Sequence, residues 1–223
     1  MSARVLVIGA SRGIGRELVR QYLADGATVT ATARQAQDVA ALEAQGATAF
    51  ALDVADATSA SGLAWRVDNA GFDIAIVVAG VYGPDQTGIE APAQADFDKV
   101  MHANVLGPMR VLAQLGDALA PNARLVVLSS AMGSIGARTD SRGWLYRASK
   151  AAVNSVVKDA SLQFKGKATC IAIHPGWVQT DMGGPGAALT PERSVSDMRR
   201  TLAALTPAQN GCFLNHDGTP IAW

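Results

Sequence analysis

Two residues suited to proton transfer stand four positions apart in the run Tyr146-Arg147-Ala148-Ser149-Lys150. In a helix, the phenol and the ammonium lie on one face, one turn apart. A free phenol has a pKa of about 10, so a lysine charge beside it is expected to lower the pKa of Tyr146. Tyr146 could then donate a proton to a carbonyl oxygen or accept one from an alcohol. The pair alone has little weight, because many helix faces carry such a pair by chance.

A glycine-rich turn, Gly9-Ala10-Ser11-Arg12-Gly13-Ile14-Gly15, separates the first apolar run from the first expected helix. Its three glycines allow a tight turn in which backbone N–H groups approach a pyrophosphate, and the positive end of the helix favours the same anion. Ordinary strand-to-helix turns also contain glycines. The position of the turn between a first strand and a first helix nevertheless predicts a dinucleotide site.

The residue that follows the second apolar run indicates which dinucleotide is bound. An acidic side chain there binds the ribose hydroxyl of NAD, whereas an arginine accommodates the 2′-phosphate of NADP. Arg34 occupies this place, no acidic residue follows before Asp38, and Arg12 in the glycine turn could reach the same phosphate. Any single arginine is more often a solvated one, but two at the two expected places favour NADP(H), with NAD(H) still possible.

Short apolar runs alternate with longer amphipathic segments, which is typical of βαβ units and a parallel sheet. Strands are expected at Val5–Ile8, Thr28–Thr32, Thr48–Leu52, Ile74–Val78, Leu125–Leu128, Thr169–Ile173 and Gly211–Asn215. Helices are expected at Gly13–Ala24, Gln35–Gln45, Ser59–Asn69, Gln94–Leu119, Leu145–Phe164 and Ser194–Leu205. Ligands bind beyond the carboxyl ends of such strands, where Ser129 and Ser130 follow the fifth. We therefore predict one doubly wound Rossmann-type α/β domain over residues 1–223, with strand order 3-2-1-4-5-6-7.

Composition narrows the function classes. Nineteen basic and nineteen acidic residues give no net charge, so neither a nucleic acid nor an anionic membrane is an expected partner. No apolar stretch is long enough to span a bilayer and no leader segment is recognisable, which predicts a cytoplasmic protein. Cys170 and Cys212 are too few for a disulfide scaffold, and Cys170 reads as a core residue. His102, His174 and His216 lack ligand spacing, so no metal is expected.

These features together resemble the short-chain dehydrogenase/reductase family over nearly the whole chain. The matching motifs are Gly9-x₃-Gly13-x-Gly15, Asp53-Val54, Asn104, Ser130, Tyr146-x₃-Lys150 and Pro175-Gly176-x₃-Thr180. Several stretches also resemble its C-factor-like carbonyl reductase branch: Ser129–Gly136, Tyr146–Ala152, His174–Met182 and the terminal Trp223. The resemblance implies an oxidoreductase that transfers a hydride between NADP(H) and a small carbonyl or alcohol substrate.

The resemblance also implies a role for each site residue. Tyr146 would be the acid/base, and Lys150 would lower its pKa and hold the nicotinamide ribose. Ser130, rather than Ser129, would bind the substrate carbonyl, and Asn104 would anchor a water that relays protons to solvent. Asp53 and Val54 would flank the adenine, and Thr180 would meet the carboxamide. The full implied cofactor set is Gly9, Ser11, Arg12, Gly13, Ile14, Gly15, Arg34, Asp53, Val54, Ala79, Gly80, Tyr146, Lys150, Pro175, Gly176, Val178 and Thr180.

Three departures from the family pattern stand out. The usual Asn-Ala-Gly after the fourth strand reads Val78-Ala79-Gly80, and Ile8 replaces the threonine that often precedes the first glycine. Both positions are structural. Sixteen positions separate Ser130 from Tyr146, more than is usual, and the extra residues within 137–143 could shape the substrate pocket.

Some alternatives remain open at this level. The alternative to an oxidoreductase is a non-catalytic dinucleotide-binding regulator or signalling protein. The presence of both Tyr146 and Lys150 favours an enzyme. The glycine-rich loop Gly183–Pro191 suits either a substrate lid or an ordinary surface connection. By resemblance, a homodimer or homotetramer is expected, formed through the helices at 94–119 and 145–164. The sequence does not identify the substrate.

Overall fold

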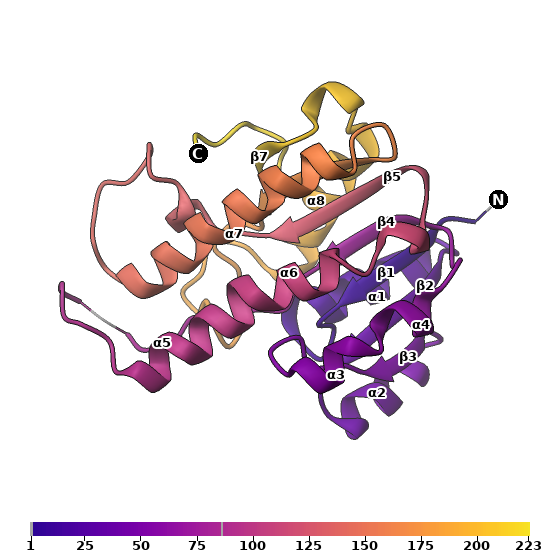
Figure 1. The fold of residues 1–223 in the computed structure, drawn as a ribbon, viewed down its shortest axis with the longest axis horizontal. Helices are drawn as coiled ribbons and strands as arrows, with labels where there is room; N and C mark the ends of the chain where they lie inside the picture. The colour runs from indigo at the N-terminus through magenta and orange to yellow at the C-terminus, as the bar shows by residue number, and fades with distance from the viewer. Residues whose placement is uncertain (1, 86) are drawn as a thin grey trace.

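Seven strands form one parallel sheet in the order β3-β2-β1-β4-β5-β6-β7, in a computed structural model that describes residues 2–85 and 87–223 (Figure 1). Each neighbouring pair is in parallel register; β1 pairs with both β2 and β4. The predicted fold and strand order are confirmed. The strands are β1 (Arg4–Ile8), β2 (Thr28–Ala33), β3 (Thr48–Ala51), β4 (Phe72–Val77), β5 (Leu119–Leu128), β6 (Ala168–His174) and β7 (Cys212–Asn215).

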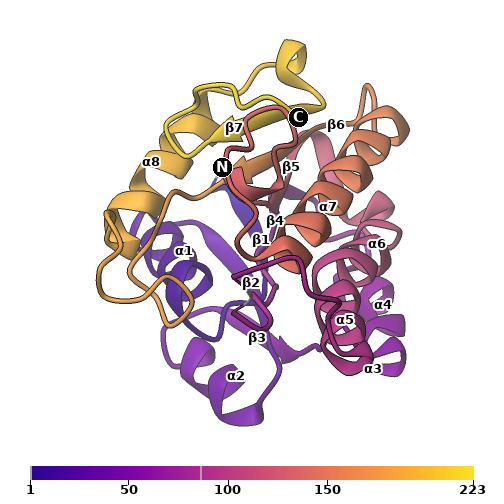
Figure 2. The same ribbon diagram turned by 90° about the vertical axis from the view of Figure 1, so that its left-hand side faces the viewer.

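Helices cover both faces of the sheet, α1, α2 and α8 on one side and α3 to α7 on the other (Figure 2). Their bounds are α1 (Gly13–Ala24), α2 (Ala36–Glu43), α3 (Ala57–Ser61), α4 (Leu63–Val67), α5 (Gln94–Met101), α6 (Gly107–Leu112), α7 (Trp144–Gln163) and α8 (Pro191–Ala204). Shorter turns are the π-helical His102–Leu106 and the 3₁₀ turns Gly116–Ala118, Ala131–Gly133 and Pro207–Gln209. Among the residues described, no helix has the length and apolar content needed to cross a bilayer.

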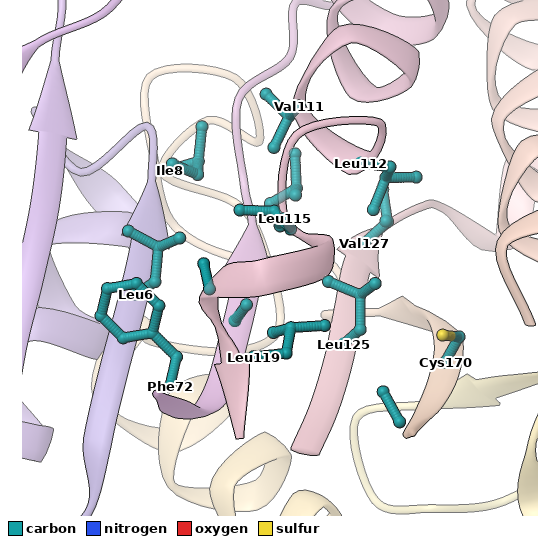
Figure 3. Close-up of a cluster of buried hydrophobic side chains, with 14 of the residues drawn as sticks. Leu6, Ile8, Phe72, Val111, Leu112, Leu115, Leu119, Leu125, Val127 and Cys170 are labelled. Atoms are coloured by element: carbon teal, nitrogen blue, oxygen red, sulfur yellow. The ribbon is translucent and has the colours of Figure 1, made fainter. Parts of the chain in front are cut away.

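The core consists of two apolar layers, one on each face of the sheet. Side chains alternate along each strand, so Leu6 and Ile8 of β1 join the layer beneath α6 and α7, while Val5 and Val7 join the layer beneath α1 and α8. Figure 3 shows part of the first layer. Cys170 is fully buried there, as predicted. Because both faces are covered, the strands read as continuous apolar runs.

The predicted helix at 94–119 is wrong in its second half. The helical path passes through a π-helical turn at His102–Leu106 and stops at Leu112; Leu119 already pairs with Phe72 of β4 as the first residue of β5. The register then shifts, and Asn122 adopts a left-handed φ of 63° before β5 continues. Apolar residues at helical spacing continue past Leu112, yet Leu115 and Leu119 are buried from a turn and a strand. The spacing of apolar residues alone could not distinguish a continued helix from a turn followed by a strand.

The predicted helix at 59–69 is also different, because it is divided at Gly62 into α3 and α4. Asp56 caps α3 by accepting a hydrogen bond from the Ser59 amide at 2.6 Å. The Ser59 hydroxyl in turn accepts from the Asp53 amide at 2.8 Å, which fixes the chain just beyond β3. These two hydrogen bonds tie the start of α3 to the loop that carries Asp53.

Candidate active site

A cleft of about 540 Å³ lies at the carboxyl ends of the central strands, the edge where such sheets bind ligands. It brings together segments that are distant in the sequence: the glycine turn after β1, the ends of β2 and β4, helix α7 and the loop after β6. The predicted residues that line it are Gly9, Ser11, Arg12, Gly13, Ile14, Arg34, Asp53, Val54, Ala79, Gly80, Tyr146, Lys150, Pro175 and Thr180. The other predicted residues, Gly15, Asn104, Ser130, Gly176 and Val178, are not part of its lining.

The glycine turn has no room for side chains at its first and third glycines. A Cβ on Gly15 would lie 2.2 Å from the Gly9 carbonyl oxygen, and one on Gly9 would lie 2.8 Å from the Ala79 nitrogen. Gly9 also has a φ of +93°, which side chains rarely adopt. Gly15 thus acts beneath the cleft by letting α1 start close to β1.

Two arginines stand at the end of the cleft where the sequence predicts an NADP phosphate. Arg34 follows β2 directly and lines the cleft. Arg12 forms an ion pair with Asp181 of the loop after β6, with 2.7 Å between Nη1 and Oδ2 and both side chains largely exposed. Close by, a Cβ on Gly13 would lie 3.0 Å from the Thr180 methyl carbon. The loop after β6 therefore touches the glycine turn across the cleft.

Tyr146 lies in the first turn of α7 and is buried. Its ring is 4.7 Å from that of Tyr82 between centroids, and its hydroxyl lies beside the Ser130 side chain. Burial raises the pKa of Tyr146 to about 12, against a smaller lowering by the Ser130 hydrogen bond and a further rise from Tyr82. Desolvation is the largest of these effects and Lys150 is not among them, so the lowering of this pKa by Lys150 stays a prediction. The Tyr146 hydroxyl is therefore protonated at neutral pH.

Lys150 lies one helical turn beyond Tyr146 and is also buried. Its Nζ donates a hydrogen bond to the Leu128 carbonyl oxygen at 2.9 Å and lies 5.7 Å from the centroid of the Tyr146 ring. Burial lowers the pKa of Lys150 to about 8, since the charged amine is removed from water. The ammonium is thus held at the end of β5 and faces the cleft.

The two serines after β5 have different partners. The Ser129 hydroxyl donates a hydrogen bond to Asn154 Oδ1 of α7 at 2.5 Å. Ser130 accepts from the Met132 amide at 3.2 Å and has its hydroxyl beside Tyr146. Of the two, Ser130 is the one placed next to the reactive phenol.

Asn104 lies behind the cleft, in the π-helical turn, and is 1% exposed. Its Oδ1 accepts from the Val81 amide and its Nδ2 donates to the Val81 carbonyl, each at 2.8 Å. Nδ2 also donates to the Ser149 hydroxyl at 2.9 Å, and that hydroxyl donates to the Tyr146 carbonyl at 2.8 Å. The Asn104 side chain is therefore a clamp on its neighbours, and its role in a water relay stays a prediction.

The loop after β6 closes one side of the cleft with Pro175 and Thr180. Gly176 has a φ of +85° and leaves room for Leu189 and His216, while buried Val178 forms a bridge with Leu189. The glycine-rich segment Gly183–Pro191, which suits either a substrate lid or a surface connection, is tied to Gln179: this residue donates to the Leu189 carbonyl at 2.8 Å from its amide and to the Ala187 carbonyl at 2.9 Å from its side chain. An opening motion of the loop Gly183–Pro191 stays a prediction.

Four contributors were not expected from the sequence: the Tyr82 ring, the Leu128 carbonyl, the Ser149 hydroxyl and Asp181. Each acts through a tertiary contact with a residue far away in the chain, and no motif marks such contacts. His102, expected to be only packed or solvated, lines the cleft together with Lys99. Lys99 and His102 are exposed residues of a helical segment, and no motif in the sequence marks them as lining a cleft.

Comparison with known proteins agrees with this geometry. The family model for short chain dehydrogenases matches residues 3–188. The C-signal protein of Myxococcus xanthus is 39% identical over 132 residues, which cover 58% of this chain and 80% of that protein. A 1-hydroxy-2-glutathionyl-2-methyl-3-butene dehydrogenase of Rhodococcus sp. (strain AD45) is 32% identical over 234 residues, covering 98% of this chain and 99% of the dehydrogenase.

Two solved structures match the whole fold. A short-chain dehydrogenase/reductase from Burkholderia multivorans with bound NADP superposes with a TM-score of 0.90 at 31% identity. An NADPH-bound carbonyl reductase from chicken fatty liver superposes with a TM-score of 0.81 at 29% identity. In both cases 100% of each chain is covered. With the family model matched over most of its length, this chain belongs to the short-chain dehydrogenase family, in its carbonyl reductase branch.

Proposed function

We propose that this protein reduces an aldehyde or ketone to an alcohol with NADPH. The observation that carries the proposal is the buried Tyr146 hydroxyl, which lies beside the Ser130 side chain and in a residue that lines a dinucleotide-sized cleft. With a pKa of about 12, this phenol is protonated at neutral pH and is suited to protonate a carbonyl oxygen.

The residues present fit the cofactor. Gly9 and Gly15 leave the turn after β1 open to a pyrophosphate, and the start of α1 adds favourable backbone N–H groups. Arg34 and Arg12 would bind the 2′-phosphate, which a planar guanidinium suits well. The NADP and NADPH bound by the two solved neighbours support the same choice.

The reaction divides between the cofactor and the side chains. NADPH, when bound, supplies a hydride to the carbonyl carbon. Ser130 donates a hydrogen bond to the carbonyl oxygen, and Tyr146 transfers its phenolic proton to that oxygen as the alcohol forms. Lys150 stabilises the phenolate left behind, which regains a proton from solvent. Proton transfer of this kind contributes about 10²–10⁴-fold to a rate.

The test is NADPH consumption against a panel of aldehydes, ketones and quinones, with NADH run in parallel. At least one carbonyl should be converted to its alcohol with one NADPH consumed per alcohol, and NADH should be the poorer donor. If no member of a broad panel is reduced while NADPH still binds, the proposed activity is refuted.

A non-catalytic signalling role is the second candidate, and the name of the Myxococcus xanthus relative is what favours it. It predicts that NADPH binds without turnover. The placement of Tyr146 and Lys150 in one cleft, with Ser130 beside Tyr146, supports the enzyme instead, because a regulator needs no proton donor there. The same panel separates the two.

We further propose that the protein forms a homodimer or homotetramer through the helical layer that includes α5, α6 and α7. Phe97 of α5 and Met109 of α6 are exposed apolar side chains on this layer. Sedimentation of the wild type and of a Met109→Glu variant tests this: a single monomeric species for the wild type would contradict it.

A further inference from the structure

We infer that the segment Ile221–Trp223 positions the serine-bearing turn of the active site, and that Trp223 is therefore a positioning residue for the proposed reduction. The inference rests on the proposed function for its catalytic part. It starts from the loop that follows Ser130, which has to keep the Ser130 hydroxyl beside Tyr146.

The turn after Ser130 is rigidly built. Ser130 begins the 3₁₀ turn Ala131–Gly133, accepting from the Met132 amide at its hydroxyl and from the Gly133 amide, at 2.7 Å, at its carbonyl. Gly133 presses on α7 so closely that a Cβ would lie 2.8 Å from the Lys150 backbone. The position of the Ser130 hydroxyl thus depends on where this turn sits against α7.

The segment Ile221–Trp223 holds the next residues of the same turn. Buried Ser134 donates to the Ala222 carbonyl at 2.6 Å. The amides of Ile135 and Gly136 both donate to the Trp223 carbonyl oxygen, at 3.1 and 2.9 Å. Three hydrogen bonds therefore join residues nearly ninety positions apart, and Figures 1 and 2 both show the C-terminal end beside this loop.

Trp223 is in turn anchored to the sheet. Its ring stacks on Phe213 of β7, with 5.6 Å between centroids and 25° between planes. The Ile221 amide donates to the Phe213 carbonyl at 2.8 Å, so the segment runs beside β7. Phe213 is 2% exposed and belongs to the core layer under α7. The aromatic stack is thus the fixed point from which the segment reaches Ser134.

Through this chain of contacts, Trp223 influences the position of Ser130, a residue that it does not contact. Without the indole, the segment loses its stack on Phe213, and the carbonyls of Ala222 and Trp223 no longer have fixed positions. The turn from Ser130 to Gly136 then keeps its contact with α7 and its own internal hydrogen bonds, but loses its fixed connection to β7. A misplacement of about 1 Å at a reacting group can cost on the order of 100-fold in rate.

The experiment compares wild type with Trp223→Ala, Trp223→Phe and Trp65→Ala. Trp65 lies on α4, is 88% exposed and serves as the matched control. Hydrogen exchange is measured over residues 131–137, and kcat, KM and the NADPH dissociation constant are measured with a carbonyl that wild type reduces. Trp223→Ala should speed exchange in this turn and lower kcat/KM by about 10–100-fold. NADPH affinity should change by less than about twofold, since the turn is outside the cofactor cleft lining.

The variants separate a positioning role from a general loss of stability. Trp223→Phe keeps an aromatic stack and should recover most of kcat/KM, whereas Trp65→Ala should match wild type throughout. Unchanged exchange in Trp223→Ala would overturn the inference, and so would faster exchange with wild-type kcat and KM. If wild type reduces no carbonyl, the proposed function fails, and the exchange measurement still decides whether the segment holds the turn.

Discussion

The side chain of Asn104 bonds both backbone polar groups of Val81, accepting from its amide and donating to its carbonyl, each at 2.8 Å. Val81 directly precedes Tyr82, whose ring lies on that of Tyr146. The π-helical turn that carries Asn104 thus fixes the loop after β4, and through it one wall around the reactive phenol. Such turns are frequent at functional sites.

Replacing Asn104 with alanine should destabilise the fold. The change leaves the two partly buried Val81 groups without their partner, and an unsatisfied buried group costs about 1–3 kcal/mol. We expect Asn104→Ala to lower the free energy of unfolding by about 2–5 kcal/mol in urea titrations. Gln94→Ala, which removes an exposed amide on α5, is the control and should change it by less than about 0.5 kcal/mol. An Asn104→Ala protein as stable as this control would refute the clamp.

Lys150 should give stability a characteristic dependence on pH. Burial lowers its pKa from 10.5 to about 8, so between these values the folded protein binds fewer protons than the unfolded chain. Stability conferred through this group therefore rises with pH across that window, and the cost of the buried charge is fully present below it. Relative to Lys150→Met, wild type should gain up to about 3 kcal/mol on going from neutral pH toward 10.5.

The measurement for Lys150 is the difference in unfolding free energy between wild type and Lys150→Met at several pH values. Groups common to both proteins cancel in this difference. Exposed Lys158 lies in the same helix, and Lys158→Met should show no comparable trend. A wild-type advantage that stays flat or falls with rising pH would contradict the lowered pKa of Lys150.

The sequence was sufficient to predict the sheet order because each strand is a short apolar run and each connection is long enough for a crossover helix. The same rule could not find the start of β5, since residues 113–119 keep an apolar spacing that suits either a helix or a buried turn. The division of the expected helix at Gly62 could not be predicted by that rule either. Helix ends depend on which backbone groups find partners in the sheet, as Leu119 does with Phe72.

The candidate site divides in a similar way. Residue types and spacing predicted the glycine turn and the Tyr146–Lys150 pair, and the structure brings both to one cleft. The rise in the pKa of Tyr146 could not be predicted from the sequence, because it comes mainly from the burial of the phenol in the folded chain. The ion pair between Arg12 and Asp181 could not be predicted from the sequence either, since it joins two loops across the cleft.

Arg34 should decide the choice of cofactor. Hydrogen bonds to charged groups contribute roughly 1.5–3 kcal/mol each, so losing one costs about ten- to a hundredfold in affinity. Arg34→Asp also repels the 2′-phosphate and offers an acceptor to the hydroxyl of NAD. We expect wild type to bind NADPH more tightly than NADH, and Arg34→Asp to reverse that order.

Titration of both reduced cofactors into both proteins tests this choice. Lys167→Asp makes the same change of charge in an exposed residue just before β6, at the opposite edge of the sheet, and should keep the wild-type preference. Wild type that binds NADH as tightly as NADPH would show that Arg34 does not contact the cofactor phosphate.

The most direct test of the proposed chemistry is the turnover rate of Tyr146→Phe in NADPH-dependent carbonyl reduction. This variant keeps the ring that stacks on Tyr82 and removes only the proton-donating oxygen. Tyr22→Phe changes another buried tyrosine, on α1, and is the matched control. We expect Tyr146→Phe to lose about 10²–10⁴-fold in kcat with nearly unchanged NADPH affinity, while Tyr22→Phe keeps its rate. A Tyr146→Phe protein with most of the wild-type kcat would contradict the proposed chemistry.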